Sequence, residues 1–208
     1  MADDATFLAM LETDRDAMPV YADWLEERGE SRRAAFVRLD HQLRGFTPRQ
    51  RRVGALGLAA ELRALAQGLP VDWLAAVAHP RLVGTAWRGR DDDGLLVLRF
   101  LTGGVLNYSQ LSGTYQNGTW IQIGSALVME TNNHYADYEA VIVGDRIRGI
   151  AHNIVRKKWA WSVARSYDPE VTQIPDRVVT TVFGHHPAAI RGRRATPRRP
   201  RRSRGRRK

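Results

Sequence analysis

The sequence predicts an α+β protein: a small helical domain over residues 1–80, an antiparallel up-and-down β-barrel of about eight strands over residues 81–166, and a disordered basic tail over residues 191–208. Apolar side chains recur at helical spacing in the first part, whereas from Val83 to Val163 they alternate with the two-residue period of strands. The tail holds ten arginines and Lys208 without an acid, so it cannot bury a core. Residues 167–190 are expected to be a linker in which residues 178–183 add a strand or rest on the barrel.

The first helices are predicted between residues 4 and 43. Residues 4–12 are typical of a short amphipathic helix, and residues 19–43 of a helical hairpin. Gly29 would end the first arm of the hairpin, and Ser31 would cap the second. The side chains expected to face inward are Val20, Tyr21, Trp24, Leu25, Phe36, Leu39 and Leu43.

Two more helices are predicted before the barrel. Residues 47–50 (TPRQ) have the pattern of a capping box with proline at the first helical position. They open a helix to about Leu65, with Leu58 and Leu62 on its inner stripe. A short helix over residues 70–78 would pack Trp73 inward before a turn at His79-Pro80.

The string VYADWLEERGESRRAAFVRL at residues 20–39 resembles the bacterial repeat-companion domain. The string LPVDWLAAVAHP at residues 69–80 resembles the segment that often closes that module. The resemblance covers roughly the first 80 residues. It implies an accessory or interaction module that docks a protein partner, and it carries over no catalytic residue.

The barrel strands are predicted from alternation and from turn residues. Turn chemistry occurs at residues 91–94, 103–104, 117–118, 132–133 and 144–145, a spacing typical of an up-and-down sheet. The strand count is eight if GTYQ before Asn117 is a loop, and nine if Asn117-Gly118 closes a hairpin. Eight is favoured because a closed barrel of that size leaves no exposed edges.

The barrel region resembles lipocalin-like and calycin-type β domains. The residues that carry the resemblance are GTAW at 84–87, GTW at 118–120, YEAVIVGDRIRGIAHN at 138–153 and KWAWSVAR at 158–165. The resemblance implies a cup that either binds a small apolar molecule or is filled by its own side chains.

Large aromatic side chains are numerous for one small barrel, which favours a filled interior. The specific hypothesis is that Trp87, Trp120 and Trp159 form a packed cluster inside it and that no sizeable pocket remains. His134 lies in a turn and His152 ends a strand, so both are candidates for the barrel mouth. The full set of candidate ligand or mouth residues is Trp87, Tyr115, Trp120, His134, Tyr138, His152, Trp159 and Trp161.

No catalytic motif is found, so we expect a non-enzymatic protein without a cofactor or a metal. The acidic cluster Asp23, Glu26 and Glu27 could bind a cation or a basic partner, but it is more simply a solvated helix face. Arginines at positions 28, 32 and 33 were expected to neutralise it.

Charge along the chain is uneven. The net charge is +10 and the tail contributes +11, so the other 190 residues sum to −1. The tail therefore predicts nonspecific, salt-sensitive binding of nucleic acid or another polyanion. The residues expected to bind it are Arg193, Arg194, Arg198, Arg199, Arg201, Arg202, Arg206 and Arg207.

Cysteine is absent and no long apolar run occurs, which favours a cytoplasmic protein without a membrane partner. Two functions stay open. The first is an interaction or accessory protein, with a helical docking module and a barrel that holds a small apolar molecule. The alternative is a nucleic-acid-associated protein that acts through its tail.

Overall fold

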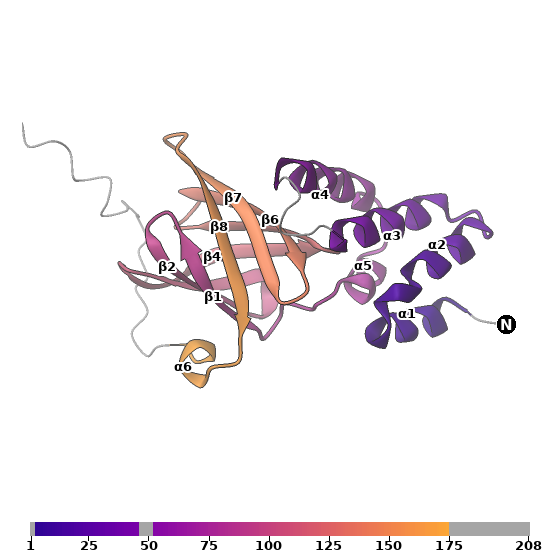
Figure 1. Cartoon of the computed structure of the whole chain (residues 1–208), viewed down its shortest axis with the longest axis horizontal. Coiled ribbons are helices and arrows are strands. Elements are labelled where there is room, and N and C mark those ends of the chain that lie inside the picture. Colours follow the sequence, from indigo (N-terminus) through magenta and orange to yellow (C-terminus); the bar gives the residue numbers. More distant parts are fainter. Residues whose placement is uncertain (1–2, 46–51, 175–208) are drawn as a thin grey trace, which may run out of the picture.

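The computed structural model describes residues 3–45 and 52–174. Figure 1 shows the helices that precede the barrel gathered on one side of the molecule and the β-barrel on the other. The predicted capping box at residues 47–50, the strand at 178–183 and the basic tail lie outside the described residues. The helices are α1 (Asp4–Thr13), α2 (Met18–Glu26), α3 (Ser31–Arg44), α4 (Arg52–Ala66), α5 (Val71–Val77) and α6 (Pro169–Thr172), with 3₁₀ turns η1 (Arg15–Ala17) and η2 (Thr102–Gly104).

Eight antiparallel strands close into an up-and-down barrel, as predicted. Each strand pairs with its neighbours in the sequence, and β1 pairs with β8 from Ala86↔Ser166 to Arg90↔Ser162. Closure leaves no free edge in this sheet. The strands are β1 (Ala86–Asp91), β2 (Gly94–Phe100), β3 (Val105–Gln110), β4 (Gly113–Ile123), β5 (Ala126–Thr131), β6 (Ala136–Val143), β7 (Arg146–Asn153) and β8 (Lys158–Ser166).

Strand β4 differs from the prediction. The GTYQ segment is strand rather than loop, and Asn117-Gly118 lies inside β4 rather than in a turn. The turn between β3 and β4 is at residues 111–112. The register of these two strands shifts between Leu106 and Tyr108, so the Asn-Gly pair accompanies a bulge-like irregularity. The count of eight is right, although GTYQ was wrongly assigned to a loop.

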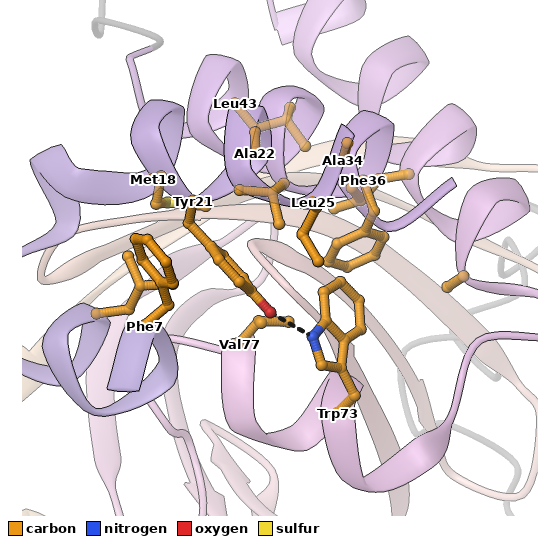
Figure 2. Close-up of a cluster of buried hydrophobic side chains, with 14 of the residues drawn as sticks. Phe7, Met18, Tyr21, Ala22, Leu25, Ala34, Phe36, Leu43, Trp73 and Val77 are labelled. Carbon is orange, nitrogen blue, oxygen red and sulfur yellow. Dashed lines mark hydrogen bonds between the residues drawn. The ribbon is translucent and has the colours of Figure 1, made fainter. Parts of the chain in front are cut away.

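The helical part has a core built around Tyr21 and Trp73. Figure 2 shows the indole Nε1–H of Trp73 donating to the Tyr21 hydroxyl, at 2.8 Å. The same hydroxyl donates to Asp4 Oδ1 at 2.5 Å, so one tyrosine joins α1, α2 and α5. Phe36 of α3 lies edge-on to Trp73, with ring centroids 5.4 Å apart. Both polar aromatic tips are thus paired inside an apolar cluster, as buried hydroxyl and indole groups require.

Residues of the YADWLEERG string serve this packing. Leu25 is buried, and Trp24 is half-buried beneath the guanidinium of Arg28, which lies 3.8 Å from its ring centroid. Ser31 is the first residue of α3, and Glu30 occupies the N-cap position; the Ser31 hydroxyl donates to Glu26 Oε1 at 2.8 Å. The prediction of a Ser31 cap was therefore wrong.

Val20 is also placed differently from the prediction, with 60% of its surface exposed. The inner face of α2 is formed by residues at positions i, i+3, i+4 and i+7, which leaves Val20 on the outer side. Those residues are Met18, Tyr21, Ala22 and Leu25.

The helices pack directly onto the outer wall of the barrel. Ala126 of β5 and Val141 of β6 belong to the helical core, and Ile123 and Val143 pack against it. Asp40 of α3 is fully buried at this contact. A hydrophobic core shared in this way makes the helices and the barrel mutually dependent.

A second outer contact lies beneath α6. Arg99 projects from the outer face of β2 and is nearly fully buried. Its Nε donates to the carbonyl of Val171 at 2.6 Å, and its Nη1 donates to Asn107 and Ser109 at 3.0 Å each. Burial lowers the pKa of Arg99. None of the helices in the described parts of the chain is both long and apolar enough to cross a membrane.

Candidate ligand site at the far end of the barrel

The barrel has two distinct ends. The turn at residues 124–125 contacts Asp40 of α3, and the turns at 102–104 and 144–145 lie at this same helix-side end. The opposite end, called the far end below, carries the turns at 92–93, 111–112, 132–135 and 154–157. An ion pair between Lys157 and Asp92 joins two of the far-end turns.

The helix-side half of the interior is filled and its polar groups are paired. Trp87 Nε1 donates to Thr85 Oγ1 at 2.8 Å. Trp120 Nε1 donates to the carbonyls of Val105 and Leu101, at 3.0 and 3.2 Å. Phe100 packs edge-on to Trp120, with ring centroids 5.2 Å apart. Trp87 and Trp120 are therefore part of the packed barrel core, and their indole N–H groups are hydrogen-bonded.

The far-end half of the interior holds a cluster of five aromatic side chains. Tyr108 and Tyr115 stack with ring centroids 5.2 Å apart. Tyr138 makes edge contacts with two indoles of β8, at 5.8 Å to Trp159 and 5.5 Å to Trp161. All five pack in the barrel core, with Tyr115 and Trp159 only partly buried. We call Tyr108, Tyr115, Tyr138, Trp159 and Trp161 the far-end cluster.

The two indoles of β8 pair with small residues on β7. In the strand register Trp159 pairs with Ala151, and Trp161 pairs with Gly149. A Cβ at Gly149 would lie 1.9 Å from the carbonyl oxygen of Glu139, so no larger residue fits there without a backbone shift. Trp159 and Trp161 are two residues apart on β8, so their side chains point to the same face of the sheet.

Two polar groups of the far-end cluster have no hydrogen-bond partner in the part of the chain that the structure describes. Nε1 of Trp159 and Nε1 of Trp161 are both buried and make no hydrogen bond within the described residues. Trp161 is 2% exposed, so bulk water does not solvate it. A buried donor left unpaired costs roughly 1–3 kcal/mol. Each of these two indole N–H groups would be stabilised by an acceptor atom.

A chain of hydrogen bonds holds the Tyr108 side chain in the far-end cluster. The Tyr108 hydroxyl donates to Asn117 Oδ1 at 2.9 Å, and Asn117 Nδ2 donates to Asn132 Oδ1 at 3.5 Å. Burial raises the pKa of both Tyr108 and Tyr138. The two phenols therefore stay neutral near pH 7 and act as hydrogen-bonding groups rather than as bases.

The two histidines lie on the outer surface and not in the cluster. His134 is mostly exposed, and its Nδ1 is 2.7 Å from Glu130 Oε2. His152 Nε2 is 3.3 Å from Asp137 Oδ2, across the outer face of β6 and β7. Within the described ranges, no group of three or more histidine and acidic side chains is arranged to hold a metal ion.

The predicted acidic cluster has an internal partner. Arg38 donates to Asp23 Oδ1 and Glu26 Oε2, both at 2.9 Å. Arg38 was not among the arginines expected to neutralise the cluster, because it lies 12 residues from Glu26 and 15 from Asp23 in the sequence. Hydrogen bonds from the side chains of Ser31 and Arg38 to the Glu26 carboxylate lower the pKa of Glu26.

The structure thus brings together four of the eight candidate residues: Tyr115, Tyr138, Trp159 and Trp161. Trp87 and Trp120 lie toward the other end of the interior. Tyr108 and Asn117 were missed, because Asn117-Gly118 was assigned to a turn. The stacked pair of Tyr108 with Tyr115 and the bond to Asn117 depend on the register between β3 and β4.

Comparison with known proteins identifies no relative: no protein-family model, no curated protein and no solved structure matches the chain. The resemblances to the repeat-companion domain and to lipocalin-like barrels remain predictions from the sequence.

Proposed function

We propose that the chain is a non-enzymatic binding protein whose barrel holds a small, largely apolar molecule at its far end. The carrying observation is the pair of buried indole donors of Trp159 and Trp161 that lack an acceptor. They lie beside aromatic rings that offer flat apolar contact. A molecule with an apolar body and one acceptor oxygen would satisfy the donors and pack on the rings.

The size of the molecule is limited by the rest of the interior. Leu96, Leu98 and Phe100 are fully buried in the same core, and Leu98 pairs with Tyr108 of the cluster in the strand register. The ligand proposed here is therefore about the size of one ring system. We propose that it enters beside the partly buried Trp159, between the far-end turns.

Two uncharged aromatic probes of similar size, one with an acceptor oxygen and one without it, test this proposal. Acetophenone and ethylbenzene differ by a carbonyl oxygen, and neither carries a charge that the basic tail could attract. Acetophenone should raise the melting temperature of the full chain in a saturable way, and more than ethylbenzene does. Trp161→Phe should remove the difference between the two probes, whereas Trp120→Phe should keep it. Equal effects of both probes on the unaltered protein would refute an acceptor site.

The helical part is the proposed docking module for a protein partner. Two aliphatic side chains, Val20 and Val71, remain 60% and 78% exposed on it. A photoreactive residue at position 71 should cross-link a discrete partner in cell extract, and one at the exposed Ile121 of the barrel wall should not. The same product from both positions would argue against a dedicated helical surface.

The alternative function is nucleic-acid binding through residues 191–208, and it rests on their charge of +11. Neutralised phosphates release counterions, so the affinity should fall steeply with salt. Removal of residues 191–208 should abolish retention of DNA and RNA at low salt. Unchanged retention after this removal would refute the alternative.

A further inference from the structure

Arginines of β1 and β7 gather on the outer wall of the barrel, on either side of β8. In the strand register Ser162 of β8 pairs with Arg90 of β1 on one side and with Arg148 of β7 on the other. Ala164 of β8 pairs in the same way with one further arginine on each neighbouring strand. The four arginines thus stand at the corners of a rectangle in the sheet. We call Arg88, Arg90, Arg146 and Arg148 the arginine rectangle.

All four side chains of the arginine rectangle point away from the barrel core. Trp161 and Val163 of β8 belong to that core. Ser162 and Ala164 alternate with them and therefore face outward, and residues paired directly across strands share a face of the sheet. Three of the four arginines are exposed and Arg148 is half-buried. Figure 1 shows β7, β8 and β1 side by side on a wall of the barrel that helices α1–α5 leave uncovered.

The positive charges of the arginine rectangle are not neutralised by the described part of the chain, in which none of its arginines forms an ion pair. Asp145 directly precedes β7, but it lies 4.0 Å from Arg165. Helix α6 packs against β1 through Val171. Its two acids, Asp168 and Glu170, form no ion pair with these arginines within the same ranges. Charge on the folded part is therefore uneven, although residues 1–190 sum to −1.

The spacing of the four arginines makes their potentials add. Neighbouring strands lie about 4.8 Å apart and same-face residues about 7 Å apart along a strand, so the rectangle measures roughly 10 by 7 Å between Cα positions. These lengths are close to the Debye length of about 8 Å at physiological salt. Between the two rows of arginines, β8 presents only the small outward side chains of Ala160, Ser162 and Ala164. A bound chain can therefore approach β8 closely and reach the guanidinium groups of both rows.

We propose that the arginine rectangle is a docking surface for a nucleic-acid strand, which lies along β8 with its phosphates between the two rows of arginines. The planar guanidinium fork matches the oxygens of a phosphate, and a linear chain of evenly spaced charges meets both rows at once. The small side chains of β8 offer no ring on which a base could stack, so the contact is with the backbone and independent of sequence. This surface is separate from the far-end ligand site, and it extends the nucleic-acid binding proposed for residues 191–208 to the folded part of the chain.

Site-directed photocross-linking in the full chain tests this surface, with single-stranded oligothymidylate as the probe. The photoreactive residue replaces either Ala164, inside the arginine rectangle, or Ile121, which is exposed on β4 at the opposite side of the barrel. A strand held only by the basic tail would reach both positions, so the ratio of the two yields reports the folded surface. At low salt the yield at position 164 should exceed that at 121 by about tenfold, and the excess should fall as salt is raised. Position 160, which is also exposed on β8, takes the label if position 164 does not tolerate it.

Variants separate the arginine rectangle from general charge effects. Arg88→Gln combined with Arg146→Gln should lower the yield at position 164 by about tenfold or more, the loss expected for two charged contacts. Arg28→Gln combined with Arg156→Gln removes the same charge from exposed sites elsewhere and should leave the ratio unchanged.

Three results would overturn the proposal, and none of them bears on the far-end ligand. Equal yields at positions 164 and 121 would mean that the tail alone holds the strand. A ratio that survives Arg88→Gln with Arg146→Gln would remove the arginines from the contact. An equally large ratio with polyglutamate as the probe would assign the surface to an acidic protein instead.

Discussion

The backbone N–H of Ser125 donates to Asp40 Oδ1 at 2.5 Å, and this bond ties a turn of the barrel to helix α3. The other oxygen of the carboxylate accepts from Arg44 Nη2 and Nε at 2.9 and 3.1 Å. The buried Asp40 side chain thus binds a residue 85 positions away in the sequence. Its negative charge is neutralised by Arg44 of the same helix. The helices and the barrel are held together by this contact as well as by the shared apolar core.

Asp40→Ala should destabilise the protein by roughly 3 kcal/mol, because it leaves both the Ser125 N–H and the Arg44 guanidinium without their acceptor. Urea unfolding of the full chain measures this loss. Asp23→Ala is the matched control, since it also removes a carboxylate paired with an arginine, but at an exposed site. The contact would be of minor importance if the two variants had similar stability.

The turn beneath Asp40 should be equally intolerant of a larger residue. Gly124 has a φ of +56°, and a Cβ there would lie 2.6 Å from Asp40 Oδ1. Gly144 has a φ of +55°, but a Cβ added there would have no atom within 4 Å. Gly144→Ala therefore measures the backbone strain without a steric clash. Gly144→Ala should cost about 1–2 kcal/mol of strain. Gly124→Ala should cost at least about 1 kcal/mol more, and equal losses would contradict the close contact.

The two buried tryptophans Trp161 and Trp120 should respond differently to replacement by phenylalanine. Trp120→Phe loses a bonded indole N–H, whereas Trp161→Phe removes an unpaired one. Without ligand, the first variant should therefore be less stable than the second by about 1–2 kcal/mol. Thermal or urea unfolding compares them. If Trp161→Phe is the less stable, its N–H already has a partner, such as the face of the Tyr138 ring.

His79 should make the stability depend on pH. Its pKa is lowered from 6.5 to about 4 on folding, mainly by burial, so between these values the unfolded chain binds a proton that the folded chain does not. Stability should fall as the pH is lowered through this range and should level off below about 4. In buffer without phosphate or sulfate, His79→Gln should flatten the curve. A curve identical to that of the unaltered protein would mean that His79 titrates normally.

The barrel could be predicted from the sequence because its strands alternate and most of its turns contain glycine, asparagine or aspartate. The Asn117-Gly118 pair shows the limit of such local patterns. Asn-Gly is typical of a hairpin turn, yet Asn117 lies within β4, where it accepts a hydrogen bond from Tyr108 of the preceding strand β3. Only the register between strands distinguishes the two arrangements.

The candidate site was predictable in its composition but not in its position. Which aromatic side chains meet depends on strand direction, which places Trp159 and Trp161 toward one end and Trp87 toward the other. Asp40 followed by Arg44 is the pattern of an ordinary exposed helix pair. Its burial follows from a contact with Ser125 that no pattern near residue 40 indicates.

The most direct measurement of the central claim follows the indole N–H signals of the full chain by NMR. The chain has six tryptophans, and Trp159→Phe and Trp161→Phe assign the two signals that matter. On titration with acetophenone, the N–H signals of Trp159 and Trp161 should move downfield and saturate together, while those of Trp87 and Trp120 stay in place. Signals of Trp159 and Trp161 that do not respond, or that move no more than those of Trp87 and Trp120, would contradict a ligand site at the far end of the barrel.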